Sequence, residues 1–65
     1  MNLTVNGKAQ DTKAQTVQQL VEQFGLAEQP VAVELNQKVV PRRLHGQMSL
    51  AEGDVIEMVQ LVGGG

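Results

Sequence analysis

The stretch TVQQLVEQFG, residues 16–25, carries the helical signal around which the rest of this chain is organised. Thr16 and Gln19 have the spacing of a capping box, in which both side chains bond free backbone groups at a helix start. Apolar residues at positions 17, 20, 21 and 24 share one helical face. Gly25 then supplies the left-handed conformation that commonly ends a helix. The stretch therefore predicts one amphipathic helix with a defined start and end.

Two short segments before the helix predict a β-hairpin. Residues 2–5 alternate polar and apolar side chains, which is the period of a strand, and residues 8–12 are interpreted as the partner strand. Between them stands Asn6-Gly7, a pair that tolerates the two positive φ angles of a type I′ turn. We therefore expect two antiparallel strands joined by a two-residue turn.

A second pair of strands is expected after the helix. Residues 31–36 alternate and lead, through a turn near Asn36-Gln37, into a short strand over residues 38–40. Pro41 ends that strand, and because proline lacks a backbone N–H the short strand is expected at a sheet edge.

The last strand is predicted over residues 55–62, after a segment over 42–49 that has no clear period and is interpreted as irregular or as a single helical turn. Ile56 and Met58 are expected to face the helix. The period of two then places the following side chains on the opposite face: Glu57, Val59 and Leu61.

The order strand, strand, helix, strand, strand, strand favours an α+β fold. A chain of 65 residues makes one small domain. We expect the helix to pack on one face of a mixed sheet of four to five strands, with the other face in water. Because so small a core cannot enclose a sizeable ligand pocket, function is expected on the surface or at an end of the chain.

Composition excludes several classes of function. The chain contains no cysteine, so it has neither a disulfide framework nor a thiolate site. Seven acidic against five basic residues, with one aromatic residue, argue against a nucleic-acid partner. The longest apolar run, Val31-Ala32-Val33, is too short for a membrane helix or a signal peptide. We expect a cytoplasmic protein, monomeric when free and without a membrane partner.

Three consecutive glycines, Gly63 to Gly65, close the sequence. Glycine has no side chain to bury and loses much backbone entropy on ordering, so this run adds nothing to a core. Such a run at one defined position is also unexpected by chance. A cloned linker or an unselected terminus remains an alternative to a functional role.

Two stretches resemble the ThiS family of sulfur carrier proteins in the thiamin pathway, which are bacterial relatives of ubiquitin: VELNQKVVPR, residues 33–42, and LAEGDVIEMVQLVGGG, residues 50–65. The resemblance implies a β-grasp domain over residues 1–62 and a flexible glycine tail over 63–65. Two departures stand out. Gly63 replaces the small non-glycine residue that often precedes the family's diglycine, and the segment after Pro41 is more basic.

The resemblance also implies a role for the terminal glycines. In the family, a ubiquitin-activating-like adenylyltransferase uses ATP to adenylate the carboxylate that corresponds to Gly65. A sulfur donor, a cysteine desulfurase or similar enzyme, then displaces AMP and leaves a thiocarboxylate for thiazole synthase. The chain itself would be a protein co-substrate that binds no cofactor or metal, rather than an enzyme.

The tail and the last strand are the candidate site. Gly63 and Gly64 have no Cβ and suit passage through a narrow channel to the active site of another protein. Because ordering the tail on docking costs affinity, binding must come from elsewhere. The outward-facing Val59 and Leu61 are the candidate docking patch, with Glu57 at its rim.

Other interpretations stay open. The small subunit of molybdopterin synthase, or another β-grasp thiocarboxylate donor, belongs to the same class, whereas a ubiquitin-like adaptor or modifier would carry no sulfur. A β-grasp fragment with an artificial linker is a further alternative. Ser49, His45 and Asp54 are the only set resembling a catalytic triad, and volume argues against it. Glu52 with Asp54 is interpreted as a solvated turn and Arg42-Arg43 as a solvated pair, with an acidic partner as the alternative for the arginines.

Overall fold

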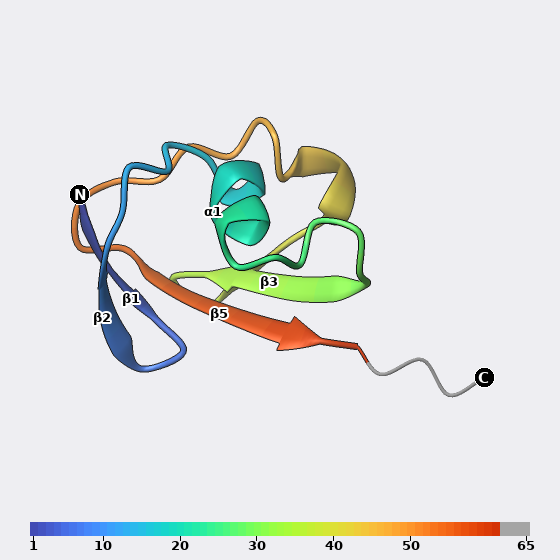
Figure 1. Cartoon of the computed structure of the whole chain (residues 1–65), viewed down its shortest axis with the longest axis horizontal. Helices are drawn as coiled ribbons and strands as arrows, with labels where there is room; N and C mark the ends of the chain where they lie inside the picture. The colour runs from blue at the N-terminus through green and yellow to red at the C-terminus, as the bar shows by residue number, and fades with distance from the viewer. Residues whose placement is uncertain (62–65) are drawn as a thin grey trace.

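The computed structural model describes residues 1–61, and the predictions for Val62 and for the tail over 63–65 lie outside this range. Its five strands form one sheet, and helix α1 and a 3-10 turn lie together on one side of that sheet (Figure 1). The elements, in chain order, are β1 Asn2–Val5, β2 Lys8–Asp11, α1 Val17–Gln23, β3 Val31–Leu35, β4 Lys38–Val40, the 3-10 turn Arg42–Leu44 and β5 Val55–Gln60.

The predicted hairpin is confirmed. β1 pairs with β2 in antiparallel register, and the connecting residues Asn6 and Gly7 have φ angles of 51° and 81°, as a type I′ turn requires. β2 ends at Asp11, one residue earlier than expected. The reason is local, because the hydroxyl of Thr12 accepts a hydrogen bond from the Ala14 N–H and turns the chain toward the helix.

Both ends of α1 follow from their sequence signals. Thr16 Oγ1 accepts a hydrogen bond from the Gln19 N–H at 3.2 Å, while Gln19 Oε1 accepts from the Gln15 N–H at 2.7 Å, one residue before the N-cap. At the other end Gly25 has a φ of 74°. The helix closes as a Schellman motif, with N–H to C=O bonds from Gly25 to Glu22 and from Leu26 to Val21.

The sheet has the strand order β2-β1-β5-β3-β4. β1 and β5 are parallel, and the other neighbours are antiparallel, so the sheet is mixed. The last strand of the chain is therefore the central strand of the sheet, and the predicted edge position of β4 is confirmed. The predicted single helical turn is also confirmed, at Arg42–Leu44. β5 ends at Gln60, and Leu61 follows it outside the strand.

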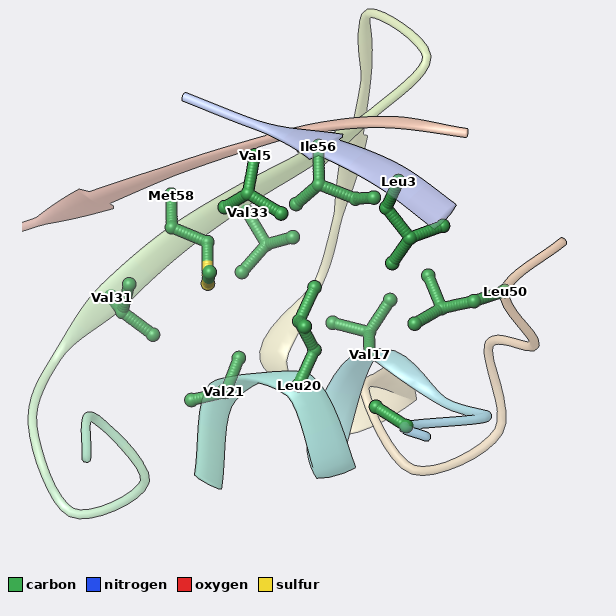
Figure 2. Packing of buried hydrophobic residues seen from close by; sticks show 11 residues of the cluster. Leu3, Val5, Val17, Leu20, Val21, Val31, Val33, Leu50, Ile56 and Met58 are labelled. Atoms are coloured by element: carbon green, nitrogen blue, oxygen red, sulfur yellow. The ribbon is translucent and has the colours of Figure 1, made fainter. Parts of the chain in front are cut away.

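The core lies between α1 and one face of the sheet. Figure 2 shows Leu20 and Val17 of the helix pointing toward Ile56 and Val33 of the strands. All four of these side chains are at most 1% exposed, and Met58 is 6% exposed. The expectation that Ile56 and Met58 face the helix is therefore confirmed. Burial of these aliphatic side chains is the main stabilising contribution to the fold.

Two asparagine side chains fasten β5 from both sides. Asn6 Oδ1 accepts from the Met58 N–H at 2.8 Å, and its Nδ2 donates to the Met58 carbonyl at 3.2 Å. Asn36 Oδ1 accepts from the Val55 N–H at 2.9 Å, and its Nδ2 donates to Asp54 Oδ1 at 3.0 Å. The Asn6 amide acts like an added peptide group of the neighbouring strand, whereas the Asn36 amide bonds one backbone N–H of β5 and the Asp54 carboxylate. β5 is therefore held at its first residue and in its middle.

Candidate functional site

The sheet face opposite α1 is the candidate docking surface of the described chain, and we call it the outer face. Strand pairing identifies its members, because residues directly opposite each other in the register point to the same side. They are Asn2 and Thr4 of β1, Ala9 and Asp11 of β2, Val55, Glu57 and Val59 of β5, Ala32 and Glu34 of β3, and Val39 of β4. Leu61 continues the outward series of β5.

Large apolar side chains are exposed on this face. Across residues 1–61, every large hydrophobic side chain that remains well exposed belongs to it: Val39 at 70%, Val59 at 58%, Leu61 at 50% and Val55 at 45%. The predicted exposure of Val59 and Leu61 is confirmed. Their role in docking stays a prediction, and the concentration of such residues on one face supports it, since scattered apolar residues would be distributed over the whole surface.

Glu57 lies within the outer face, between Val55 and Val59 on the central strand. From the sequence alone we expect it at the rim of a patch made by Val59 and Leu61. Its direct neighbour on β3 is Glu34. Alternation along residues 31–36 could have placed Glu34 on the outer face, but nothing in the sequence indicates which residue of β5 lies beside it.

The end of β5 is held by the loop that precedes β3. The Leu61 N–H donates to the Pro30 carbonyl at 2.8 Å, and the side-chain amides of Gln60 and Gln29 are hydrogen bonded. Arg42 fixes the same loop through Nη2, which donates to the Ala27 carbonyl at 3.2 Å. The chain therefore leaves the sheet at a defined point. Gly63, Gly64 and Gly65, the predicted reacting tail, lie outside the described residues.

The set that resembled a catalytic triad does not form one. His45 is buried, with Nε2 hydrogen bonded to the Val40 carbonyl at 3.1 Å. The Asp54 carboxylate accepts from the Ala51 N–H and from the Asn36 amide, so it closes a turn. Ser49 pairs with Thr16 in an isolated bridge. All three residues serve the fold.

The acidic turn likewise has a structural role. Glu52 accepts a hydrogen bond from the Asn2 N–H at 2.9 Å. Within residues 1–61 no three histidine, aspartate or glutamate side chains gather into a group that could hold a metal ion. No helix in this part of the chain is long and apolar enough to cross a membrane.

The relatives of this chain fall into two groups, one of much longer proteins and one of proteins of the same length. The chain is 36% identical over 66 residues to a thiazole synthase of Paramagnetospirillum magneticum, and 39% identical to one of Magnetococcus marinus. All of this chain is matched, but it spans only 20% of each of those proteins. It is also 35% identical over 66 residues to the sulfur carrier protein ThiS of Escherichia coli, with both chains covered completely.

The fold has a close counterpart among solved structures. The crystal structure of the thiamine biosynthesis protein ThiS from Geobacter metallireducens superposes with a TM-score of 0.83 at 35% identity, and each chain is covered completely. The one-helix, five-strand mixed sheet is thus the expected β-grasp fold. The model of the ThiS family matches residues 3–65, which include the three glycines. The chain described here belongs to the ThiS family.

Proposed function

We propose that this chain is a sulfur carrier of thiamin biosynthesis, with the carboxylate of Gly65 as the group that carries the sulfur. The observation that supports this most directly is the family match, which continues through Gly63 and Gly64 to Gly65. Full-length similarity to proteins named as sulfur carriers in Escherichia coli and Bacillus subtilis points the same way. The chemistry requires that Gly65 be the terminal residue of the mature protein.

The reaction sequence follows from the properties of a carboxylate. Being anionic, the group resists nucleophiles and offers only oxide as a leaving group. Attack of its oxygen on the α-phosphorus of ATP releases pyrophosphate and forms an acyl adenylate. A sulfur nucleophile from the donor then adds to the acyl carbon, and AMP departs with the electron pair of the broken C–O bond. Where the donor delivers its sulfur as a persulfide, the first product is an acyl disulfide, and a thiol supplies the two electrons that cleave its S–S bond. The product is a thiocarboxylate, whose sulfur is the nucleophile in the next step. ATP is a substrate of the activating enzyme.

This chain contributes a fixed starting point and a docking surface. The Leu61 N–H is tied to Pro30, so residues 62–65 begin at a defined position beside the outer face. Four residues extend at most roughly 14 Å, which limits how far the reacting carboxylate stands from the sheet. Since ordering glycines on docking is unfavourable, the apolar side chains of the outer face supply the compensating contact area.

The proposed partners are the adenylyltransferase, a sulfur donor such as a cysteine desulfurase, and thiazole synthase. The similarity to chains named thiazole synthase favours the thiazole branch over the molybdopterin synthase alternative. A cytoplasmic location and a monomeric free state belong to the same proposal. No bound cofactor is needed by this chain in the scheme, because its chemistry takes place on its own backbone.

The test is intact-mass analysis after incubation with ATP, a ubiquitin-activating-like adenylyltransferase and a sulfur source, using a chain that ends at Gly65. We expect exchange of one oxygen for sulfur, located on Gly65 by fragmentation. Deletion of Gly65 sets the carboxylate back by roughly 3.5 Å and should abolish the exchange. A modified lysine, or no change with several competent adenylyltransferases, would contradict the proposal and favour a non-covalent adaptor.

A further inference from the structure

The chain leaves β5 through a pair of residues that can make only one backbone hydrogen bond. Pro30 and Leu61 continue the antiparallel register of β3 and β5 by one position beyond its last pair. The Leu61 N–H donates to the Pro30 carbonyl at 2.8 Å. Proline has no N–H to donate in return, so one of the two bonds that such a pair ordinarily makes is absent. The position of Leu61 therefore depends on where the loop before β3 is held.

The loop over residues 26–30 is held by Arg42. Arg42 Nη2 donates to the Ala27 carbonyl at 3.2 Å, and Nη1 donates to the Gln29 carbonyl at the longer distance of 3.5 Å. Two nitrogens of one guanidinium group thus reach two carbonyls of the same short loop, which is the forked geometry that arginine provides and lysine does not. Gln29 is also bonded to Gln60 of β5 through the side-chain amides. Arg42, the loop and the end of β5 therefore form one connected set of contacts.

The backbone that carries Arg42 is itself anchored in the fold. It belongs to the 3-10 turn, which lies beside the loop in Figure 1, and its carbonyl accepts a hydrogen bond from the His45 N–H at 3.1 Å. His45 is buried, its Nε2 is bonded to the Val40 carbonyl at 3.1 Å, and its own carbonyl accepts from the Gln18 N–H of α1 at 2.9 Å. Through Arg42 the loop is therefore tied to the helix and to the core.

The neighbouring Arg43 provides the contrast. Both arginines are exposed and lie in the same turn. Within residues 1–61 the side chain of Arg43 makes no hydrogen bond or ion pair, whereas that of Arg42 reaches two carbonyls. Arg42 is therefore not simply a solvated charge, and Arg43 is the matched residue against which its role can be measured.

We propose that Arg42 is a positioning residue for the reaction at Gly65, because it fixes the loop that holds Leu61 and so sets the point from which the glycine tail starts. Glycine has a wide choice of backbone conformations, so glycines cannot set the direction of a tail by themselves. Further freedom at Leu61 would add placements of the carboxylate that do not reach the reacting atom, and transfer requires a productive placement. The inference rests on the proposed function for its reaction, and it adds Arg42 to the residues on which that reaction depends.

Hydrogen exchange in the free chain tests whether Arg42 holds Leu61. In Arg42→Ala the exchange rate of the Leu61 amide, measured by NMR, should rise about 3- to 10-fold, because the loop that accepts its hydrogen bond is released. The Met58 amide, which bonds Asn6 Oδ1 at 2.8 Å in the middle of β5, is the internal control. Its exchange rate should stay within about twofold of the parent, since general destabilisation would accelerate both amides. Arg43→Ala should change neither rate.

Adenylation kinetics test whether that hold matters for the reaction. The assay uses a ubiquitin-activating-like adenylyltransferase, ATP and chains that end at Gly65, followed as pyrophosphate exchange. In Arg42→Ala, kcat should fall about 3- to 10-fold while KM for the chain stays within about twofold, because productive placement becomes rarer and the docking contacts are unchanged. Arg42→Lys keeps the charge without the fork and should recover only part of kcat. Arg43→Ala should match the parent.

The same assay separates positioning from the binding of an acidic partner. If the arginines served to bind such a partner, both alanine variants would raise KM for the chain, and Arg42→Lys would behave like the parent. That pattern would overturn the inference. An equal loss of kcat in Arg43→Ala would overturn it as well.

Failure of this inference is distinguishable from failure of the proposed function. Parental exchange of the Leu61 amide in Arg42→Ala, or a parental kcat despite faster exchange, would overturn the inference while the carrier function stands. If no competent adenylyltransferase acts on the parent, the proposed function is wrong and Arg42 loses its role in a reaction. The exchange of the Leu61 amide, which needs no partner, then still shows whether Arg42 holds the end of β5.

Discussion

The two faces of the central strand β5 differ in what they contribute. Ile56 and Met58 point toward α1 and are almost wholly buried, whereas Val55 and Val59, their neighbours in sequence, are about half exposed on the opposite side. The inner side chains stabilise the domain. The outer ones leave about half of their area in water and lie outside the core. The same strand therefore contributes one side to the core and the other side to an exposed apolar surface. The terminal glycines follow this strand in the sequence.

The largest effect should follow from a change on the inner face. Ile56→Ala removes a fully buried side chain from a core too small to rearrange around the gap, and should cost about 3 kcal/mol. That is a large part of the roughly 5 kcal/mol expected for a domain of this size. Urea unfolding measures the loss. Val55→Ala, one position earlier and on the outer face, is the control and should cost less than about 1 kcal/mol. Equal costs would show that the two faces are not distinct.

The next effect belongs to binding. Val59→Asp adds a charge to a side chain that is 58% exposed, so the free protein should keep its unfolding free energy within about 0.5 kcal/mol. Docking to the adenylyltransferase would bury that charge among apolar side chains and should weaken by about 1–3 kcal/mol in calorimetric titration. Unfolding by this variant would mean that the faces are assigned the wrong way round.

A change beside the strand tests how β5 is held. Asn6→Ala loses two hydrogen bonds to Met58 and puts alanine at a φ of 51°, so we expect a loss of about 1–2 kcal/mol in unfolding free energy. Asn6→Gly is the control, because glycine accepts the positive φ and isolates the contribution of the side-chain bonds. If the two variants are equally stable, backbone conformation contributes nothing measurable at this turn.

The smallest effect should come from the edge of the outer face. Val39→Thr keeps the shape and β-branching of a side chain that is 70% exposed on edge strand β4. Stability and affinity should each change by less than about 0.5 kcal/mol, because peripheral contacts contribute little to binding. An affinity loss as large as that of Val59→Asp would move the centre of the docking surface from β5 to β4.

The parts of the fold that depend on near neighbours in the chain could be predicted. Asn6-Gly7 specifies its turn, Thr16 with Gln19 specifies the helix start, and Gly25 specifies its end, since each acts through backbone groups within a few residues. The alternation of β5 separated Ile56 and Met58 from Val59 in the same way. Boundaries depend on competing local bonds: the second strand ends at Asp11, because the Thr12 side chain bonds the Ala14 backbone N–H.

The candidate site could be predicted only in part for the same reason. The exposure of Val59 and Leu61 follows from the period of a strand. The sequence alone places Glu57 at the rim, because it does not indicate that β5 is the central strand or that β3 and β4 extend the face. Val55, Val39 and Glu34 were missed as members of that face.

By itself the sequence determined the hairpin, the capped helix, the side on which each residue of β5 lies, and the family signature that ends in the glycines. Only the tertiary structure decided that β5 runs between β1 and β3, that Asn6 bonds Met58 across 52 positions, and that Glu34 stands beside Glu57. Periodicity states which side of a strand a residue occupies, but its neighbour depends on register. Register is set by packing and pairing between segments far apart in the chain, so it cannot be predicted from a local sequence pattern.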